Sequence, residues 1–247
     1  MHNEFKSIPR LYINKELKKN LDVLLDKKQK HYLKNVLRLA EDKKVKLFNG
    51  INGEWEAVIL NGKCEKVRCT YLLRKQTVMS GPNLYFSLIK NNNLRWLLEK
   101  ATELGVQELH PIITERVNIR NFNYHKGLLA IKEASEVSER LELPKLHEVK
   151  SLDDALQELK YKEQKAIFCN ESKNDIHISK YFQKNFSNKI SFIIGPEGGF
   201  SEKEKKTIFT YTNVKSVKIH DRVVKAETAA ILVLSIYNSY SALKKIH

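Results

Sequence analysis

Ile190-Ser191-Phe192-Ile193-Ile194-Gly195-Pro196-Glu197-Gly198-Gly199-Phe200-Ser201 joins an apolar run to a glycine-rich turn, and the predicted architecture starts from this segment. Its first five residues are mostly apolar, as in a short strand that is buried on both faces of a parallel sheet. The glycines that follow allow backbone amides to come close to a ligand. Ser201 then stands three residues before Glu204, which is the spacing of a helix capping box. A strand, a glycine turn and a helix in this order predict a ligand site beyond the carboxyl end of the strand.

The glycine turn does not match the common phosphate-binding loops. It lacks the lysine of GxxxxGK[ST], and it is neither GxGxxG in an early βαβ unit nor the GxSxG of a nucleophile elbow. A tight turn that only needs positive φ remains the alternative if the glycines are considered alone.

The chain around this turn alternates between strand and helix patterns. Residues 84–89, 106–113 and 166–169 are short extended runs, and Leu94, Leu97, Leu98, Ala101 and Leu104 form a helical stripe that stops at Gly105. Further helices are expected at residues 128–141 and from Ser151 onward, where Asp154 has capping-box spacing. We therefore predict an α/β domain with a parallel sheet over residues 84–247.

Residues 1–73 have a different, mostly β, pattern. A strand is expected at residues 10–13, a hairpin joins residues 45–48 to 54–60 through Asn-Gly turns, and residues 67–73 alternate with a period of two. One short helix is expected at residues 31–39. These features predict a small β-barrel, and residues 74–83, which contain a Gly-Pro break, form the predicted linker.

The bulk composition favours a polyanionic partner. The 247 residues carry a formal net charge of +15, which favours nucleic acid, although a compositional bias toward lysine with a solvated surface is the alternative. No apolar run approaches the roughly 20 residues that cross a bilayer, and Met1 to Phe5 lack the apolar stretch of a secretion signal. We expect a cytoplasmic protein. The three cysteines form no CxxC pair, so no metal is expected.

Several motifs together resemble a known family. Residues 100–106 (KATELGV), Thr114-Glu115-Arg116, residues 194–200 and residues 222–229 occur in the order and at the spacing of the bacterial 16S ribosomal RNA (uridine-N3)-methyltransferases, the RsmE family of the SPOUT superfamily. The similarity covers essentially the whole chain. Ile8-Pro9-Arg10 and residues 31–38 resemble that family's RNA-binding barrel, which is of PUA-like type.

The resemblance implies a carboxy-terminal domain whose last segment makes a trefoil knot, with S-adenosylmethionine bound in the knot. It implies a homodimer formed through this domain, and 16S rRNA or the small ribosomal subunit as the partner. The cofactor-binding residues that it implies are Phe168, Cys169, Asn170, Ile194, Gly195, Pro196, Gly198, Gly199, Ile219, His220, Arg222, Val223, Val224, Thr228 and Ala229.

Some positions depart from the family pattern. His220 stands where the family has glycine, and Lys225 where it has arginine. A β-carbon at position 220 would narrow the pocket or need another backbone angle, and lysine cannot reproduce a bidentate guanidinium contact. Val137 and Glu139 replace the family's glutamine and glycine.

Uridine N3 carries a proton that must be lost before methyl transfer. Glu227 or Glu197 is the candidate to accept it, and Arg222 the candidate to stabilise the uridine anion. For Glu227 the alternative is helix capping, and for His110 a structural role is expected. The basic residues assigned to RNA by the resemblance are Arg10, Arg38, Arg95, Lys100, Arg116 and Arg140.

The last apolar stretch, residues 229–237, is apolar nearly all round and predicts burial on more than one side, as in a dimer interface. The expected function is N3 methylation of a uridine in 16S rRNA. Two alternatives remain: ribose 2′-O-methylation of another rRNA or tRNA target, and a non-catalytic RNA-binding homologue.

Overall fold

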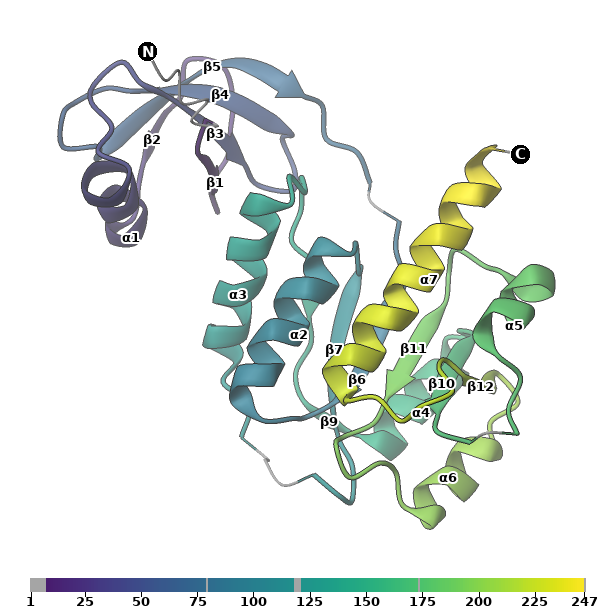
Figure 1. Ribbon diagram of the computed structural model, residues 1–247. Helices are drawn as coiled ribbons and strands as arrows, with labels where there is room; N and C mark the ends of the chain where they lie inside the picture. The colour runs from purple at the N-terminus through teal and green to yellow at the C-terminus, as the bar shows by residue number, and fades with distance from the viewer. Residues whose placement is uncertain (1–7, 79, 118–120, 173, 247) are drawn as a thin grey trace. The chain divides into compact units, whose positions relative to one another are not determined.

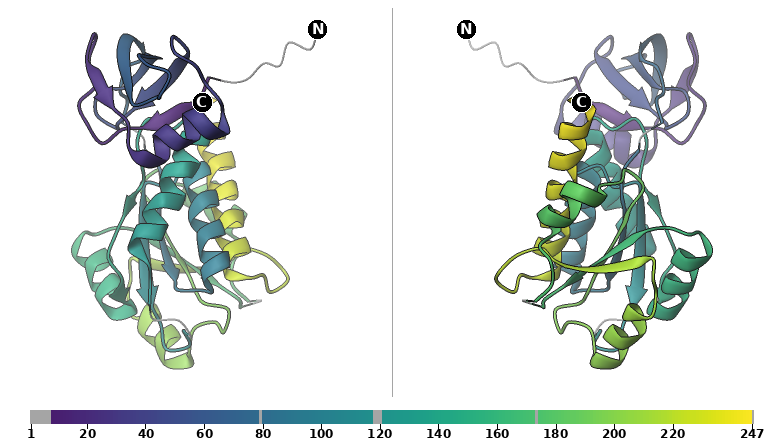
Figure 2. Two further views of the ribbon diagram at one scale, coloured as in Figure 1. Left: turned by 90° about the vertical axis from the view of Figure 1, so that its left-hand side faces the viewer. Right: turned by 90° about the vertical axis from the view of Figure 1, so that its right-hand side faces the viewer.

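The computed structural model describes residues 8–78, 80–117, 121–172 and 174–246 (Figures 1 and 2). The chain forms two compact units, Met1–Met79 with Ser135–Leu143, and Ser80–Ala134 with Pro144–His247. The start of the chain, Met1 to Phe5, lies outside the described residues. Each unit is described by itself below.

The first unit contains the strands β1 (Arg10–Tyr12), β2 (Asp22–Leu24), β3 (Lys44–Phe48), β4 (Glu54–Ile59) and β5 (Lys66–Arg74), the helix α1 (Lys27–His31) and the π-helix η1 (Tyr32–Val36). The strands of the second unit are β6 (Asn83–Ser87), β7 (Glu108–Ile113), β8 (Lys145–Leu146), β9 (Lys150–Ser151), β10 (Ala166–Asn170), β11 (Ser191–Ile194) and β12 (Val214–Lys218). Its helices are α2 (Asn91–Glu103), α4 (Leu152–Tyr161), α5 (Ile178–Asn185), α6 (Glu202–Phe209) and α7 (Ala226–Ile246). Helix α3 (Tyr124–Val137) begins in the second unit and ends in the first.

The first unit is built on a five-stranded sheet of order β1-β3-β4-β5-β2. Strands β3 and β4 pair antiparallel, which confirms the predicted hairpin. Gly53 in its turn has a φ of +80°, and a β-carbon there would lie 2.3 Å from the carbonyl oxygen of Arg74. Only glycine therefore fits at this close approach of two backbone segments. Alternate residues such as Val45 and Leu47 fill the core.

The predicted helix at residues 31–39 is wrong in its bounds. The helical segment begins earlier, at Lys27, because the Asp26 side chain accepts from the Gln29 amide and Gln29 bonds back in a capping box. It continues as the π-helix η1 and ends at Val36.

The second unit contains a seven-stranded sheet in which every pair of neighbouring strands is parallel, and this confirms the α/β fold class. The main path has the order β12-β10-β11-β6-β7-β8, with β9 also paired to β7. Successive residues of β11 face opposite layers. Ile193 packs in a cluster with α4 and α6, whereas the ring of Phe192 lies near Phe182 of α5 and Tyr237 of α7.

The three strands β12, β10 and β11 lie side by side, so the loops at their carboxyl ends meet at one edge of the sheet (Figure 1). The Ser201 side chain accepts from the Glu204 amide and Glu204 bonds back, which confirms the predicted capping box after the glycine turn. No helix in the described part of the chain is long and apolar enough to span a membrane.

Candidate functional site

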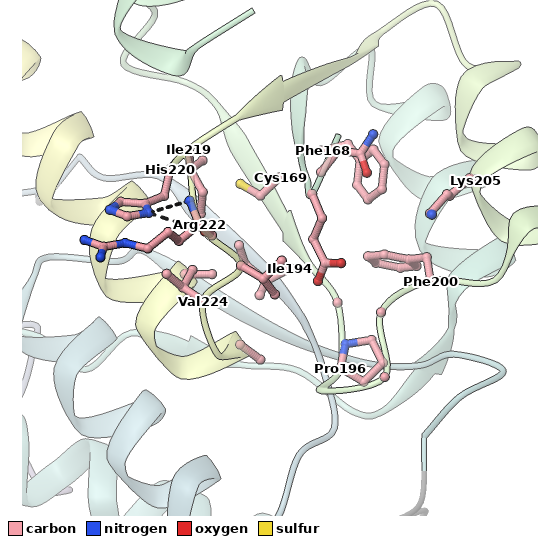
Figure 3. A pocket seen from close by; sticks show the side chains of 18 of the residues that line it. Phe168, Cys169, Ile194, Pro196, Phe200, Lys205, Ile219, His220, Arg222 and Val224 are labelled. Atoms are coloured by element: carbon pink, nitrogen blue, oxygen red, sulfur yellow. Dashed lines mark hydrogen bonds between the residues drawn. The ribbon is translucent and has the colours of Figure 1, made fainter. Parts of the chain in front are cut away.

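A cleft of about 360 Å³ opens where the loops after β10, β11 and β12 meet (Figure 3). This volume lies within the range of small-molecule sites. Its lining residues are Arg116, Phe168, Cys169, Asn170, Glu171, Ile194, Gly195, Pro196, Gly198, Gly199, Phe200, Lys205, Ile219, His220, Asp221, Arg222, Val223, Val224, Ala226 and Ala229. The cleft lies beyond the carboxyl ends of the strands, where the sequence predicts it.

The glycine turn forms one wall, and its shape depends on the missing side chains. A β-carbon at Gly195 would lie 2.6 Å from the Phe200 ring, and Gly199 has a φ of +66°. Phe200 packs edge-to-face on Phe168 with their ring centroids 5.0 Å apart. The turn is thus held against the end of β10 by an aromatic contact that any larger residue at position 195 would displace.

The loop after β12 forms the opposite wall. The backbone amide of Arg222 donates to Nδ1 of His220 at 3.0 Å. His220 is not among the described non-glycine residues with positive φ, so its backbone does not need glycine. The histidine closes a local turn with its side chain, and the Arg222 side chain remains exposed.

Charged side chains at the cleft were missed by the sequence analysis. Glu171 and Lys205 both line it, and the Glu171 carboxylate lies 3.8 Å from the position that a β-carbon of Gly199 would take. Arg116 donates from Nη1 to the Gly198 carbonyl at 3.0 Å. Glu171 directly follows the predicted Asn170, whereas Lys205 could not be distinguished from the other lysines of α6. Burial raises the pKa of the Cys169 thiol, which therefore stays protonated and apolar.

The structure brings together all the predicted cofactor-binding residues except Thr228. Thr228 lines a neighbouring pocket together with the buried Glu227. Glu197 is exposed, and its carboxylate accepts from the Lys90 amide at 3.5 Å. The three candidate catalytic residues thus lie in different surroundings, and of these Arg222 alone lines the cleft.

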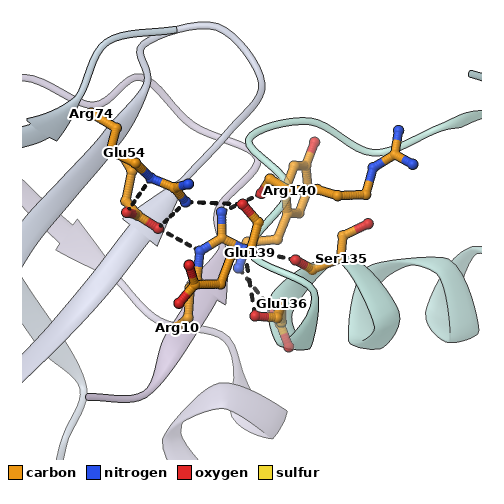
Figure 4. A network of polar contacts seen from close by, with 8 residues as sticks. Arg10, Glu54, Arg74, Ser135, Glu136, Glu139 and Arg140 are labelled. Atoms are coloured by element: carbon orange, nitrogen blue, oxygen red, sulfur yellow. Dashed lines mark hydrogen bonds and ion pairs between the residues drawn. The ribbon is translucent and has the colours of Figure 1, made fainter. Parts of the chain in front are cut away.

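Two of the predicted RNA-binding residues, Arg10 and Arg140, are buried within the first unit (Figure 4). Arg10 bonds from Nε to Glu54, donates from Nη1 to the Ser135 carbonyl at 2.7 Å, and donates from Nη2 to the Arg140 carbonyl. Its guanidinium carbon also lies 3.7 Å from the centroid of the Phe48 ring. These contacts favour a structural role for Arg10 over a phosphate contact.

Arg140 is likewise buried and bonded to the backbone, since its Nε donates to the Glu142 carbonyl at 3.2 Å. Desolvation by burial lowers the pKa of Arg140 to about 10. Burial likewise lowers the pKa of Arg10, but the Glu54 carboxylate opposes this effect. The predicted contact of these two arginines with RNA is not tested, and the burial of both side chains disfavours it.

The other four predicted RNA-binding residues lie nearer the surface. Arg95 pairs with Glu99 at 2.6 Å and with Glu133 at 3.0 Å, and Lys100 pairs with Glu103 at 2.7 Å. Arg116 is held at the glycine turn. Arg38 is exposed and has a φ of 54°, just beyond the basic segment α1–η1.

His110 lies on β7, away from the cleft, in a stack with Tyr85 and His147. Glu108 lies 3.1 Å from Nε2 of His110 and 2.8 Å from Nε2 of His147. Among the described residues this trio could hold a metal ion. However, the two imidazole planes are 13° from parallel and their centroids 3.9 Å apart, so their in-plane lone pairs do not converge on one ion. Hydrogen bonding to Glu108 accounts for the arrangement, as the structural interpretation of His110 expects.

Two family models match this chain. The model of an RNA methyltransferase domain matches residues 82–238, and that of an RNA methyltransferase PUA domain matches residues 25–65. Together with the glycine-turn cleft at the edge of a parallel sheet, they define the class of protein as an RNA methyltransferase with a PUA domain.

Relatives in sequence identify the family within this class of RNA methyltransferases. The chain is 33% identical to the Ribosomal RNA small subunit methyltransferase E of Rickettsia conorii, over 92% of this chain and 93% of that protein. It is 28% identical to the protein of the same name from Buchnera aphidicola subsp. Schizaphis graminum, over 93% and 95% of the two chains. The chain belongs to the ribosomal RNA small subunit methyltransferase E family.

Two solved structures share the fold of this chain. A methyltransferase from Legionella pneumophila, determined with its bound cofactor SAM, is 27% identical with a TM-score of 0.83, over 94% of this chain and 98% of that one. The Ribosomal RNA small subunit methyltransferase E of Neisseria gonorrhoeae, bound to S-adenosyl methionine, has the same fold, with 23% identity, a TM-score of 0.78 and the same coverage.

Proposed function

We propose that the protein is an S-adenosylmethionine-dependent methyltransferase that methylates N3 of a uridine in 16S rRNA. The observation that carries the proposal is the cleft at the ends of β10, β11 and β12, whose walls are the glycine turn and the loop after β12. Membership of the family supports the reaction and the substrate.

The cleft fits S-adenosylmethionine in shape and in charge. Apolar side chains such as Ile194, Ile219 and Val224 suit the adenine, and the open backbone of the glycine turn offers amides and carbonyls to its edge. Glu171 suits the cationic ammonium or sulfonium, and Lys205 suits the cofactor's carboxylate. When bound, the cofactor supplies the electrophilic methyl group.

Arg222 is proposed to orient the RNA or to stabilise the uridine anion, because its exposed side chain lies on the loop that lines the cleft. Glu227 is preferred to Glu197 as the proton acceptor. Glu197 is exposed and already interacts with the Lys90 amide, whereas Glu227 is buried beside the loop.

Residues 1–73 are proposed as the RNA-binding PUA-like domain, residues 74–83 as the linker and residues 84–247 as the methyltransferase domain. The net charge of +15 supports a nucleic-acid partner, with Arg38, Arg95, Lys100 and Arg116 as phosphate contacts. A substrate in the ribosome would place the enzyme in the cytoplasm.

The trefoil knot is also proposed. Strand β12 lies at one end of the sheet, whereas α7 packs on α2 and β11. The intervening chain must therefore cross the loops of β10 and β11, which supports threading at this point.

Helix α7 is proposed as a homodimer interface, because Ile231, Leu232 and Ile236 are only partly buried within this chain. Light scattering during size-exclusion chromatography should report twice the chain mass of 28.8 kDa. A species of 28.8 kDa alone would contradict the dimer.

The test of the function is nucleoside analysis of 16S rRNA from cells that lack the gene, with and without rescue. We expect 3-methyluridine to disappear in the deletion strain and to return with the wild-type gene, but not with Arg222→Ala. Persistence of 3-methyluridine in the deletion strain would exclude this target. A missing 2′-O-methylribose would instead indicate the ribose reaction, and calorimetry without saturable S-adenosylmethionine binding would indicate a non-catalytic homologue.

A further inference from the structure

A second pocket, of about 660 Å³, lies next to the cofactor cleft in the second unit. Its lining residues are Asn92, Asn93 and Trp96 from α2, and Val224, Lys225, Glu227 and Thr228 from the start of α7 and the loop before it. Val224 lines this pocket and the cleft as well, so the loop before α7 is a wall that the two share. A molecule in the second pocket would therefore lie beside the cofactor.

Glu227 gives this pocket an unsatisfied acceptor. The residue is only 7% exposed, and its Oε2 atom is buried without a hydrogen-bond partner among the described residues. A buried carboxylate oxygen without a donor is energetically unfavourable, so such atoms in native proteins are usually satisfied by a ligand, water or ion. Helix capping does not satisfy this oxygen. A ligand with an N–H group would do so.

Donors surround the acceptor. Helix α2 has no side-chain cap at its N-cap residue Lys90, so the amides of its first turn remain available. The side-chain amides of Asn92 and Asn93 and the exposed Lys225 add further donors. Helix α7 also begins at the pocket, so two helix N-termini place partial positive charge there. The pocket thus favours a ligand on which negative charge develops.

Trp96 gives the pocket an aromatic face. Its side chain is 42% exposed although it belongs to a helix that packs on α7. Exposed indole rings are the surfaces on which unstacked RNA bases commonly stack. The hydrogen-bonding groups and the ring together match a nucleobase rather than a phosphate alone.

We infer that this pocket holds the target uracil, with the Glu227 carboxylate facing N3–H, the α2 amides facing O2 and O4, and Trp96 against the ring. The inference rests on the proposed function. Uracil presents an acceptor, a donor and an acceptor on this edge, which complements the donor, acceptor and donor groups of the pocket. Cytosine has an acceptor at N3 and would meet the carboxylate unfavourably, so the pocket selects uridine.

The proton balance follows from this placement. Glu227 takes the N3 proton and becomes a neutral carboxylic acid, and the electron pair left on N3 forms the new bond to the methyl carbon. The pair of the broken carbon–sulfur bond stays on sulfur, which loses its positive charge. Glu227 then releases the proton to water.

Glu227→Gln tests the base, because it keeps the size and removes the ability to accept a proton. We expect methylation of 16S rRNA to fall about 100-fold or more, the usual contribution of a general base, while S-adenosylmethionine affinity changes less than about threefold. Trp96→Ala should raise KM for the RNA, and Trp96→Phe should restore it. Asn91→Ala is the matched control for Asn92→Ala, since Asn91 lines a different pocket at the same helix start.

A binding measurement complements the rates. The chain has two tryptophans, so Trp55→Phe leaves Trp96 as the single indole reporter. Uridine 5′-monophosphate with S-adenosylhomocysteine should quench its fluorescence more than cytidine 5′-monophosphate does, and Glu227→Gln should reduce that difference.

A wild-type protein that forms no 3-methyluridine would remove the proposed function itself. An active wild type whose Glu227→Gln and Trp96→Ala variants keep their rate and RNA KM within about threefold would overturn the uracil pocket alone. Lost S-adenosylmethionine binding in Glu227→Gln would likewise overturn it and assign Glu227 to the cofactor cleft.

Discussion

Gly195 and Phe200 are the residues that give the glycine turn its shape. A β-carbon at position 195 would overlap the Phe200 ring, which itself packs on Phe168 at the end of β10. The sequence predicted these glycines as a ligand turn, but the aromatic contact that fixes the turn joins residues that are far apart in the chain. Pattern analysis of a single strand or helix has no access to such a pair.

Gly195→Ala is expected to weaken the cofactor site. The displaced Phe200 ring should lower the free energy of unfolding by about 1–3 kcal/mol, the usual effect of overpacking. The dissociation constant for S-adenosylmethionine, measured by calorimetry, should rise about tenfold or more. Gly62→Ala is the control, because nothing lies within 4 Å of the β-carbon it would add. Equal affinity and stability in both variants would contradict this account of the turn.

His110 makes stability depend on pH. Burial, first, and the neighbouring His147 lower the pKa of His110 to about 3, against 6.5 for the free side chain. The pKa of His110 is thus lower in the folded protein than in the unfolded chain, so the folded protein binds the proton less readily. Its contribution to stability is fully present above pH 6.5 and is lost as the pH falls toward 3, at up to about 1.4 kcal/mol per pH unit.

Chemical denaturation between neutral and acidic pH measures this effect. His110→Phe keeps an aromatic ring in the stack, so the loss of stability below pH 6.5 should become less steep. His125→Gln, at an exposed position, should follow the wild-type curve. An unchanged slope in His110→Phe would rule out His110 as the source.

Helices and strands with strong local signals were predictable, and those that depend on distant partners were not. The α2 stripe, the β3–β4 hairpin and the α6 cap follow from spacing, caps and turn residues. Strand β2 has three residues and owes its existence to pairing with β5. Similarly, β8 and β9 have two residues each and exist only beside β7.

The N-caps of α6 and α4 form a matched pair. Ser201 and Ser151 each accept from the backbone amide three residues later, so each serine-to-alanine change should cost about 1 kcal/mol of stability. The α6 cap also adjoins the glycine turn, because Glu204 bonds to the amides of Ser201 and Glu115. Ser201→Ala should therefore also weaken S-adenosylmethionine binding in calorimetry, whereas Ser151→Ala should not. Equal affinities would show that the cap does not support the turn.

The chain as a whole combines a net charge of +15 with two compact units, each of which is assembled from two separate stretches of sequence. Ser135–Leu143 lies between elements of the second unit in sequence but belongs to the first, where Arg10 bonds to the carbonyls of Ser135 and Arg140. A buried arginine that bonds to the Glu54 carboxylate and to the carbonyls of a distant segment has no local sequence signature. It was therefore assigned to RNA by resemblance alone.

Replacing Arg38 should therefore affect RNA binding, whereas replacing Arg10 should affect stability. Arg38→Ala should weaken RNA binding, reduce the slope of log affinity against log salt by about 1, and leave stability unchanged. Arg10→Ala should instead lower the free energy of unfolding by roughly 1–3 kcal/mol or more, because the carbonyls of Ser135 and Arg140 lose their buried donor and Glu54 keeps only Arg74 of its described partners. Binding at several salt concentrations and denaturant titrations separate the two outcomes. A stable Arg10→Ala variant with a reduced salt slope would restore the RNA role.

Methyl transfer by the purified protein is the decisive measurement of the proposed activity. Small ribosomal subunits from cells that lack the gene are incubated with the protein and S-adenosylmethionine, and the 16S rRNA nucleosides are analysed by mass spectrometry. The cleft, the family and the uracil pocket predict new 3-methyluridine, formed by the wild type and formed more slowly by Gly195→Ala and Glu227→Gln. A methyl group on ribose or on another base, or no transfer by a protein that binds both S-adenosylmethionine and RNA, would contradict the account.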